Sequence, residues 1–103
     1  MAVNSGGQVI AVSSSFTKSY FWDPLSGTTE IAPLPGDTEV RALGLNNLGE
    51  VVGDSGPATT RHPFRWNALQ GTRLLAGLLG IGSVSAKAIN DAGEIVGNAV
   101  LQS

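Results

Sequence analysis

The chain of 103 residues contains no cysteine, which excludes disulfide bonds, thiol catalysis and thiolate metal sites. Charged residues are scarce as well, because they make up 14% of the chain against roughly 25% in an ordinary soluble domain. The hydrophobic content of 42% and the net charge of −2 argue against intrinsic disorder. The six basic residues are scattered and form no stripe that could neutralise phosphates, so we expect no nucleic-acid partner.

Long apolar runs and helical periodicity are also missing. The longest nearly apolar run, residues 74–82, is too short to cross a bilayer, so we expect no membrane span. The N-terminal residues have neither the basic start nor the apolar core of a signal peptide, and the compartment is left open. No segment repeats apolar residues at the helical period between helix caps, whereas 14 glycines and five prolines favour a turn-rich β protein.

An internal repeat organises the sequence. An Asn-x-x-Gly segment between short apolar runs occurs at residues 4–7, 46–49 and 90–93, at offsets of 42 and 44 residues. Trp22 and Trp66 also lie 44 residues apart. Self-similarity at this period is typical of repeat architectures. The sequence therefore predicts a single repeat domain, 1–103, with one unit at about 1–38, a second at about 39–82 and a half unit at 83–103.

Each Asn-x-x-Gly segment predicts the turn of a β-hairpin, because asparagine can bond its own backbone and glycine supplies a positive φ. The predicted structural turn residues are Asn4, Gly7, Asn46, Gly49, Asn90 and Gly93. Further strands are expected at residues 18–23 and 28–34 in the first unit and at 62–67 and 72–78 in the second. Four short strands in about 44 residues are typical of a propeller blade. We expect an all-β fold of about two and a half four-stranded antiparallel propeller-like units.

Two and a half units cannot close a ring of about four to eight blades. Each unit must bury its faces against neighbours, so the ends of such a chain are incomplete on their own. We therefore expect self-association into a homo-oligomer. A compact sandwich and a fragment of a longer repeat array remain alternatives.

Two segments resemble a known family. Residues 88–97, Ala-Ile-Asn-Asp-Ala-Gly-Glu-Ile-Val-Gly, and residues 45–53, Leu-Asn-Asn-Leu-Gly-Glu-Val-Val-Gly, are similar to the core of the bacterial HAF-type repeat, an extracellular repeat named for His-Ala-Phe. Here His62-Pro63-Phe64 stands at that place, and the first unit lacks the histidine. The resemblance implies a propeller-like β fold and use outside the cell or at its surface. It implies no activity, because the family has no assigned catalytic residues.

Candidate site residues gather near the aromatic strands. His62 is the only histidine, and without cysteine it makes no plausible zinc site, so we expect no metal and no cofactor. No Gly-x-Ser-x-Gly segment is present, and a structural role at a strand end is favoured for this histidine. Glu50 and Glu94 occupy equivalent positions and predict a solvated strand face. The binding candidates combine aromatic and basic side chains: Arg61, His62, Arg65, Trp66, Phe21 and Trp22.

These observations favour a non-enzymatic binding or scaffold module of the β-repeat type, with a carbohydrate or protein as the possible ligand. Propellers bind ligands at the loops of one end, which here predicts residues 13–17, 35–38, 54–61 and 79–83. A small hydrolase or lyase with its site at a subunit junction is the alternative from another class. A pair of carboxylates, or an acid facing His62 across that junction, would favour the enzyme. A third alternative is a repeat fragment without a separate function.

Overall fold

The computed structural model describes residues 2–13, 18–56, 61–75 and 82–101, and within these ranges the chain forms ten β-strands and no helix. The prediction of an all-β fold is confirmed. The described part therefore contains no helix that is long and apolar enough to cross a membrane.

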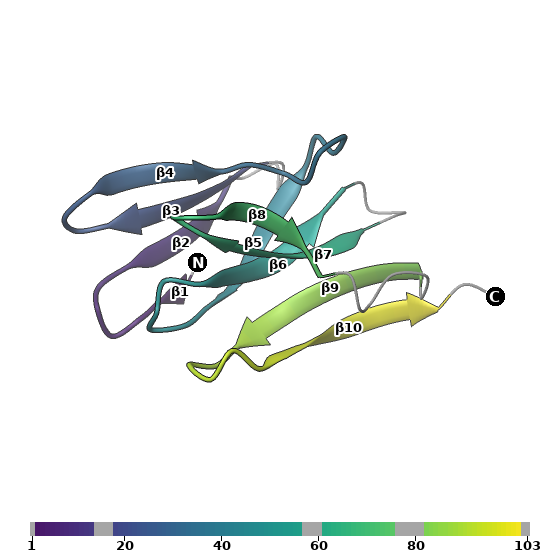
Figure 1. The fold of residues 1–103 in the computed structure, drawn as a ribbon. Coiled ribbons are helices and arrows are strands. Elements are labelled where there is room, and N and C mark those ends of the chain that lie inside the picture. Colours follow the sequence, from purple (N-terminus) through teal and green to yellow (C-terminus); the bar gives the residue numbers. More distant parts are fainter. Residues whose placement is uncertain (1, 14–17, 57–60, 76–81, 102–103) are drawn as a thin grey trace.

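The strands form two four-stranded antiparallel sheets and one hairpin, which follow one another in chain order (Figure 1). The first sheet contains β1 (Ala2–Val3), β2 (Val9–Val12), β3 (Ser19–Asp23) and β4 (Gly27–Ile31). The second sheet contains β5 (Val40–Leu45), β6 (Val51–Ser55), β7 (His62–Asn67) and β8 (Gly71–Leu74). The hairpin contains β9 (Gly82–Ile89) and β10 (Ile95–Leu101). Both sheets run in sequence order from edge to edge.

The strand bounds differ from the expected ones mainly at the fourth strand of each sheet. β4 ends at Ile31 rather than at residue 34, because Pro33 has no backbone N–H to donate to a ladder. β8 ends at Leu74 rather than at residue 78, and residues 76–78 lie outside the described part of the chain. β3 begins one residue later than expected, at Ser19, and β7 has the expected bounds.

The hairpin turns owe their shape to an asparagine and a glycine. Gly7, Gly49 and Gly93 have φ angles of 80°, 77° and 85°, a region that side chains with a Cβ rarely adopt. In the middle turn, the side-chain oxygen of Asn46 accepts hydrogen bonds from the backbone N–H groups of residues 48 and 50, at 3.0 and 2.9 Å. The asparagine therefore satisfies backbone donors that the turn removes from the ladder.

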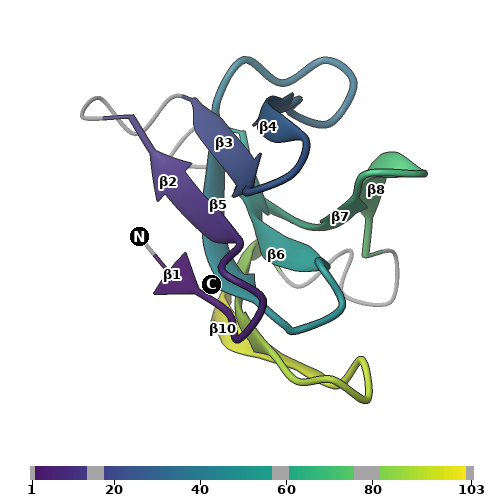
Figure 2. The ribbon, with the colours of Figure 1, turned by 90° about the vertical axis from the view of Figure 1, so that its left-hand side faces the viewer.

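The sheets pack face to face (Figure 2). The first sheet lies against β5, and β9 lies over the opposite face of the second sheet, against β5, β6 and β7. The larger core fills the space between the two sheets and contains Ile10, Phe21, Ile31, Leu34, Val40, Ala42, Val51, Phe64 and Trp66. A smaller core joins the second sheet to the hairpin and contains Val52, Ala86 and Ile89. Every residue of β6 is buried, since both of its faces are covered.

Polar contacts fix the packing of the first sheet on the second. The hydroxyl of Ser19 is fully buried, donates to the carbonyl oxygen of Val40 at 2.9 Å and accepts from the N–H of Ala42 at 2.9 Å. A buried hydroxyl without partners would lower stability, so these bonds tie β3 to one place on β5.

The second sheet also buries a carboxylate. Asp54 has no exposed surface, and Arg41 and Arg61 lie 2.5 and 3.0 Å from its oxygens. The hydrogen bond to Asp54 raises the pKa of Arg41 above its ordinary value. Because an uncompensated buried charge is strongly destabilising, the two arginines are what allows an acid in β6.

Candidate functional site

A groove lies between the first two sheets, at the end of the molecule that carries the hairpin turns. Its volume is about 420 Å³. The lining residues come from the β1–β2 turn, β3 and the β3–β4 turn of the first sheet and from the β5–β6 turn, the end of β7 and the β7–β8 turn of the second: Gln8, Phe21, Asp23, Ser26, Leu48, Gly49, Glu50, Asn67, Ala68, Leu69 and Gln70. The groove therefore exists only because the two sheets pack against each other.

One aromatic side chain, Phe21, lines the groove together with the aliphatic side chains of Leu48 and Leu69. The rings of Phe21 and Trp66 lie 5.0 Å apart between centroids, at an interplanar angle of 49°, which is a favourable geometry for an aromatic pair. Leu48 and Leu69 are 68% and 98% exposed at the tips of their turns. Exposed leucines beside a groove are apolar surface that a ligand could cover.

The rim of the groove on the first sheet carries a negative charge. Asp23 accepts hydrogen bonds from the side-chain amide of Gln8 at 2.7 Å and from the backbone N–H groups of Leu25 and Ser26 at 2.8 and 3.2 Å. The Gln8 bond is the main reason that the pKa of Asp23 lies below its ordinary value, and the two backbone bonds add to it. The carboxylate therefore stays ionised at the rim.

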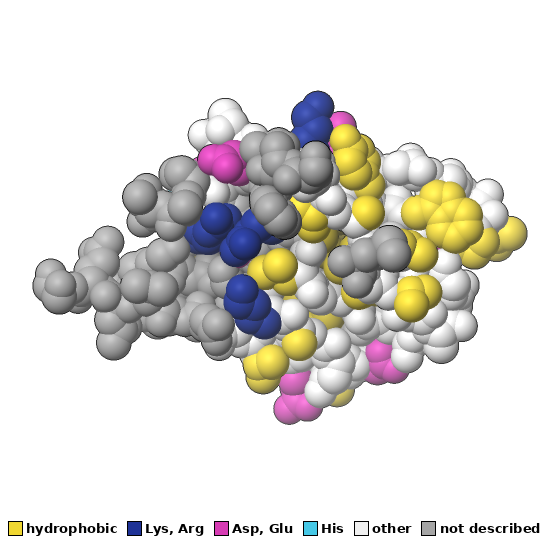
Figure 3. All heavy atoms as spheres, turned by 180° about the vertical axis from the view of Figure 1, so that it is seen from behind, with side chains coloured by type: hydrophobic (Ala, Val, Ile, Leu, Met, Phe, Trp, Pro, Cys, Tyr) yellow, Lys and Arg dark blue, Asp and Glu magenta, His cyan; other side chains and the backbone are white. Residues whose placement is uncertain are grey.

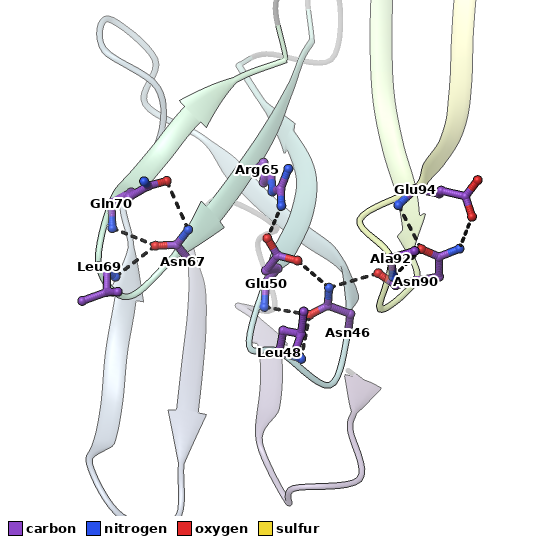
Figure 4. Close-up of polar contacts among 10 residues, drawn as sticks. All are labelled: Asn46, Leu48, Glu50, Arg65, Asn67, Leu69, Gln70, Asn90, Ala92 and Glu94. Carbon is purple, nitrogen blue, oxygen red and sulfur yellow. Dashed lines mark hydrogen bonds and ion pairs between the residues drawn. The ribbon is translucent and has the colours of Figure 1, made fainter.

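The rim on the second sheet is held by hydrogen bonds within the turns (Figure 4). Glu50 accepts from the amide of Asn46 at 2.7 Å and is paired with Arg65. These two partners, Arg65 first, lower the pKa of Glu50. Its side chain is only 14% exposed, so the expectation of a solvated strand face does not describe Glu50. Glu94 is exposed and, among the residues that the structure describes, bonds only within its own turn.

The structure distributes the predicted binding residues over separate places. Phe21 and Trp66 meet between the sheets, and Phe21 reaches the groove. Trp22 points away from the second sheet and is 43% exposed. Arg65 lies on the opposite side of the second sheet from Trp66, toward the hairpin turn at Gly93.

Arg61 and His62 lie at the other end of the second sheet, away from the turn groove. Arg61 pairs with Asp54, and the Nδ1 atom of His62 lies 3.5 Å from an oxygen of Asp37. The hydroxyl of Ser55 donates to the same Asp37 oxygen at 2.7 Å. A serine nucleophile would instead need its hydroxyl on the histidine. This arrangement orients the histidine but activates no nucleophile.

A small cavity of about 250 Å³ adjoins this histidine, lined by Leu34, Pro35, Asp37, His62 and Leu74. Two of its lining residues, Pro35 and Asp37, belong to the loop at residues 35–38, for which the sequence predicts ligand binding. Most of the remaining predicted loops, residues 14–17, 57–60 and 79–81, lie outside the described part of the chain. In the ranges that the structure describes, no three His, Cys, Asp or Glu side chains come close enough together to hold a metal ion.

Sequence reasoning missed the groove at the turn end. Among its lining residues the sequence predicts a structural turn for Gly49 and a binding role for Phe21 alone, and the position of Phe21 against the second sheet depends on contacts between sheets. One signal was available: Leu48 and Leu69 are leucines inside turn segments, where polar residues are the rule. An apolar residue with no core to enter is a candidate for ligand contact.

A scan against protein-family models, a search of the curated proteins and a search of the solved structures each found no match for this chain. The similarity to the HAF-type repeat therefore stays a prediction from its motif.

Proposed function

We propose that the chain is a non-enzymatic binding module of propeller-like β units, which holds a protein ligand in the groove between its first two sheets. The observation that carries the proposal is the groove itself, where one aromatic side chain, two exposed leucines and an ionised carboxylate converge at the junction of two units. Such a mixture of apolar surface and a few placed polar groups is typical of ligand sites.

The propeller-like character is part of the same proposal. Two four-stranded antiparallel sheets with one strand order pack face to face, as the blades of a propeller do. Ligands of repeat proteins commonly bind where neighbouring units meet, because each unit contributes one wall.

The lining favours a peptide over a sugar. Phe21 is only 6% exposed and offers little ring surface for stacking, whereas Leu48 and Leu69 offer aliphatic surface. Asp23 adds a negative charge beside that surface. The expected ligand is a protein segment with an apolar side chain next to a basic one, because that pairing matches both the leucines and the carboxylate.

Nuclear magnetic resonance with the ¹⁵N-labelled chain tests this proposal. The probe is the amidated peptide Gly-Lys-Leu-Lys-Gly, with Gly-Lys-Ser-Lys-Gly and Gly-Glu-Leu-Glu-Gly as matched controls. We expect saturable shifts of the backbone amides at residues 48–50 and 67–70 with the first peptide and much weaker shifts with the controls. Leu48→Ser and Asp23→Asn should each reduce the affinity, because one removes apolar surface and the other the charge.

Three results would count against the proposal. Shifts of equal size with all three peptides would mean that neither the leucines nor the carboxylate select the ligand. Shifts that gather around the cavity beside His62 would move the site to the other end of the molecule. Saturation by a chito-oligosaccharide and not by the peptide would exchange the protein ligand for a carbohydrate.

A further inference from the structure

The two ends of the described chain expose sheet faces whose counterparts are packed together inside it. We call the face of β1–β4 that is turned away from the second sheet the leading face, and it carries Val3, Val9 and Trp22. We call the face of β9–β10 that is turned away from the second sheet the trailing face, and it carries the cross-strand pair Ala88 and Val96. Seen from behind, hydrophobic side chains gather on the side of the molecule that carries β1–β4 (Figure 3).

The leading face has the residues of an interface, but no other described strand covers it. In the second sheet, Val51 pairs with Trp66, and both side chains are buried against the first sheet, at 0% and 4% exposure. In the first sheet, the equivalent pair is Val9 and Trp22, and there the tryptophan is 43% exposed. The same residue types at the same register differ in burial because one pair is covered by a sheet and the other is not.

The trailing face shows the complementary difference. Val96 pairs with Ala88 as Val52 pairs with Gly44 and as Ile10 pairs with Ala2. Ile10 and Val52 each lie on the face of their unit that is turned toward the next one, and they are 1% and 0% exposed, whereas Val96 is 66% exposed. The trailing face is therefore the kind of face that packs against a following unit, with no unit following it in the described chain.

Hydrogen bonds between the turns form a ladder that runs from the first sheet through the second sheet to the hairpin. The side-chain amide of Asn4 donates to the carbonyl oxygen of Asn46 at 3.0 Å, and that of Asn46 donates to the carbonyl oxygen of Asn90 at 3.1 Å. A parallel ladder joins Ser5 to Asn47 and Asn47 to Asp91. Among the described residues, the Asn90 amide donates only to Glu94 in its own turn, so the first ladder ends in a donor.

At the other end, the ladder begins with an acceptor. The carbonyl oxygens of Asn46 and Asn90 each accept two hydrogen bonds, one from the glycine of their own turn and one from the asparagine of the preceding unit. The carbonyl oxygen of Asn4 accepts from Gly7 and, within the described part, from no other group. One end of the molecule therefore offers the amide donor that the other end lacks.

We propose that copies of this chain associate head to tail, with the trailing face of one copy on the leading face of the next. The amide of Asn90 in one copy then donates to the carbonyl oxygen of Asn4 in the next, and Val96 packs against Trp22. The interface between copies continues the interface between units. A head-to-tail interface of this kind joins two different surfaces and builds a ring when it closes or a filament when it does not.

The test is the molar mass of the full chain in solution, measured by sedimentation velocity or light scattering over a range of concentrations. We expect a mass of at least twice the 10.5 kDa of the chain, with a dependence on concentration. Trp22→Glu and Val96→Glu should each weaken association about tenfold or more, since a buried charge replaces an apolar anchor. Leu69→Glu places the same charge on a residue that is 98% exposed at a turn tip, and it should leave the mass unchanged.

Mixing the two face variants separates a head-to-tail interface from a symmetric one. The Trp22→Glu chain keeps an intact trailing face and the Val96→Glu chain keeps an intact leading face. Each alone should be a monomer, and their mixture should form a one-to-one complex that grows no further. Thermal melting of both variants checks that they fold, which we expect because the two side chains are 43% and 66% exposed.

Several results would overturn the inference. A wild-type monomer at every concentration would mean that the two faces do not bind each other. Association that survives either substitution would place the interface elsewhere, and a mixture that stays monomeric would exclude the pairing of leading with trailing face. The inference is independent of the proposed ligand groove. Leu48→Ser should lose the peptide shifts and keep the mass, whereas Trp22→Glu should do the reverse.

Discussion

Gly53 of β6 provides the sharpest test of the packing. A Cβ atom at this position would lie 1.8 Å from the carbonyl oxygen of Arg41 and 2.9 Å from Cε2 of Phe64. The oxygen belongs to the backbone of β5, at the irregularity in register between Ala42 and Gly44, so it cannot rotate away as a side chain could. Phe64 is fully buried and has no space to retreat into. Gly53→Ala must therefore move one strand relative to another.

The cost follows from two contributions. Overpacking of a filled core costs about 1–3 kcal/mol, and a lost ladder hydrogen bond adds about 1 kcal/mol. We expect Gly53→Ala to lower the free energy of unfolding by about 3 kcal/mol, which corresponds to a fall in Tm of about 12 °C or more for a domain of this size. Because small domains have about 5–15 kcal/mol of stability in total, this loss removes roughly a fifth to three fifths of it.

Thermal melting followed by circular dichroism measures this loss, and Gly6→Ala is the matched control. At Gly6 a Cβ atom would meet only the side-chain oxygen of Asn4, at an ordinary 3.6 Å, so the control should change stability by about 1 kcal/mol or less. Both variants need the same protein concentration, since association raises apparent stability. A Gly53→Ala chain that melts with the control would refute the reasoning.

Three further predictions concern the turns. Gly49→Val should lower stability by about 1 kcal/mol or more, because the native φ is 77° and valine is strained at that angle. An unchanged Tm would contradict the positive φ at residue 49. Asn46→Ala should lower the free energy of unfolding by about 1–3 kcal/mol, measured by denaturant unfolding, and Asn90→Ala should lower it by less. The reason is that Asn46 is 3% exposed, whereas water can reach Asn90 in its exposed turn, and equal losses would argue against this difference. Since its partners lower the pKa of Glu50, that stabilisation is present above the ordinary carboxyl pKa of 4.5 and is lost as the pH falls through the lower value of the folded chain. The urea concentration at the midpoint of unfolding should therefore decrease when the pH is lowered from 7 to 3, and an increase would contradict this prediction.

The strands and turns could be predicted from the sequence because their causes are local. The Asn-x-x-Gly segments determine their own turns through a positive φ and side-chain hydrogen bonds to nearby backbone, and both are properties of a few neighbouring residues. The apolar runs that flank them then pair as strands. The largest differences from the expected bounds are at the ends of β4 and β8, whereas the starts of β3, β4 and β8 each differ by one residue.

Contacts between units could not be predicted in the same way. Trp22 and Trp66 are the same residue at equivalent positions of the first two sheets, yet their burial differs because a neighbouring sheet covers only one of them. The burial of Asp54 also depends on partners that are distant in the chain, because Arg41 and Arg61 reach its carboxylate from a neighbouring strand and loop. The turn groove likewise depends on how two units are placed against each other, which no window of the sequence contains.

The complete burial of β6 has a consequence for the dynamics of the chain. A strand that is covered on both faces loses its protection only when neighbours on both sides have separated, so its amide hydrogens should exchange with solvent only in the largest opening events. Within the described part of the chain, the hairpin β9–β10 has a neighbour on one face only, and its opening requires the loss of one interface. Local opening should therefore begin at the outer units and reach the middle last, as in a linear array whose members stabilise only their neighbours. Addition of a further unit at either end would slow the exchange of the unit that it covers and leave the distant units unchanged.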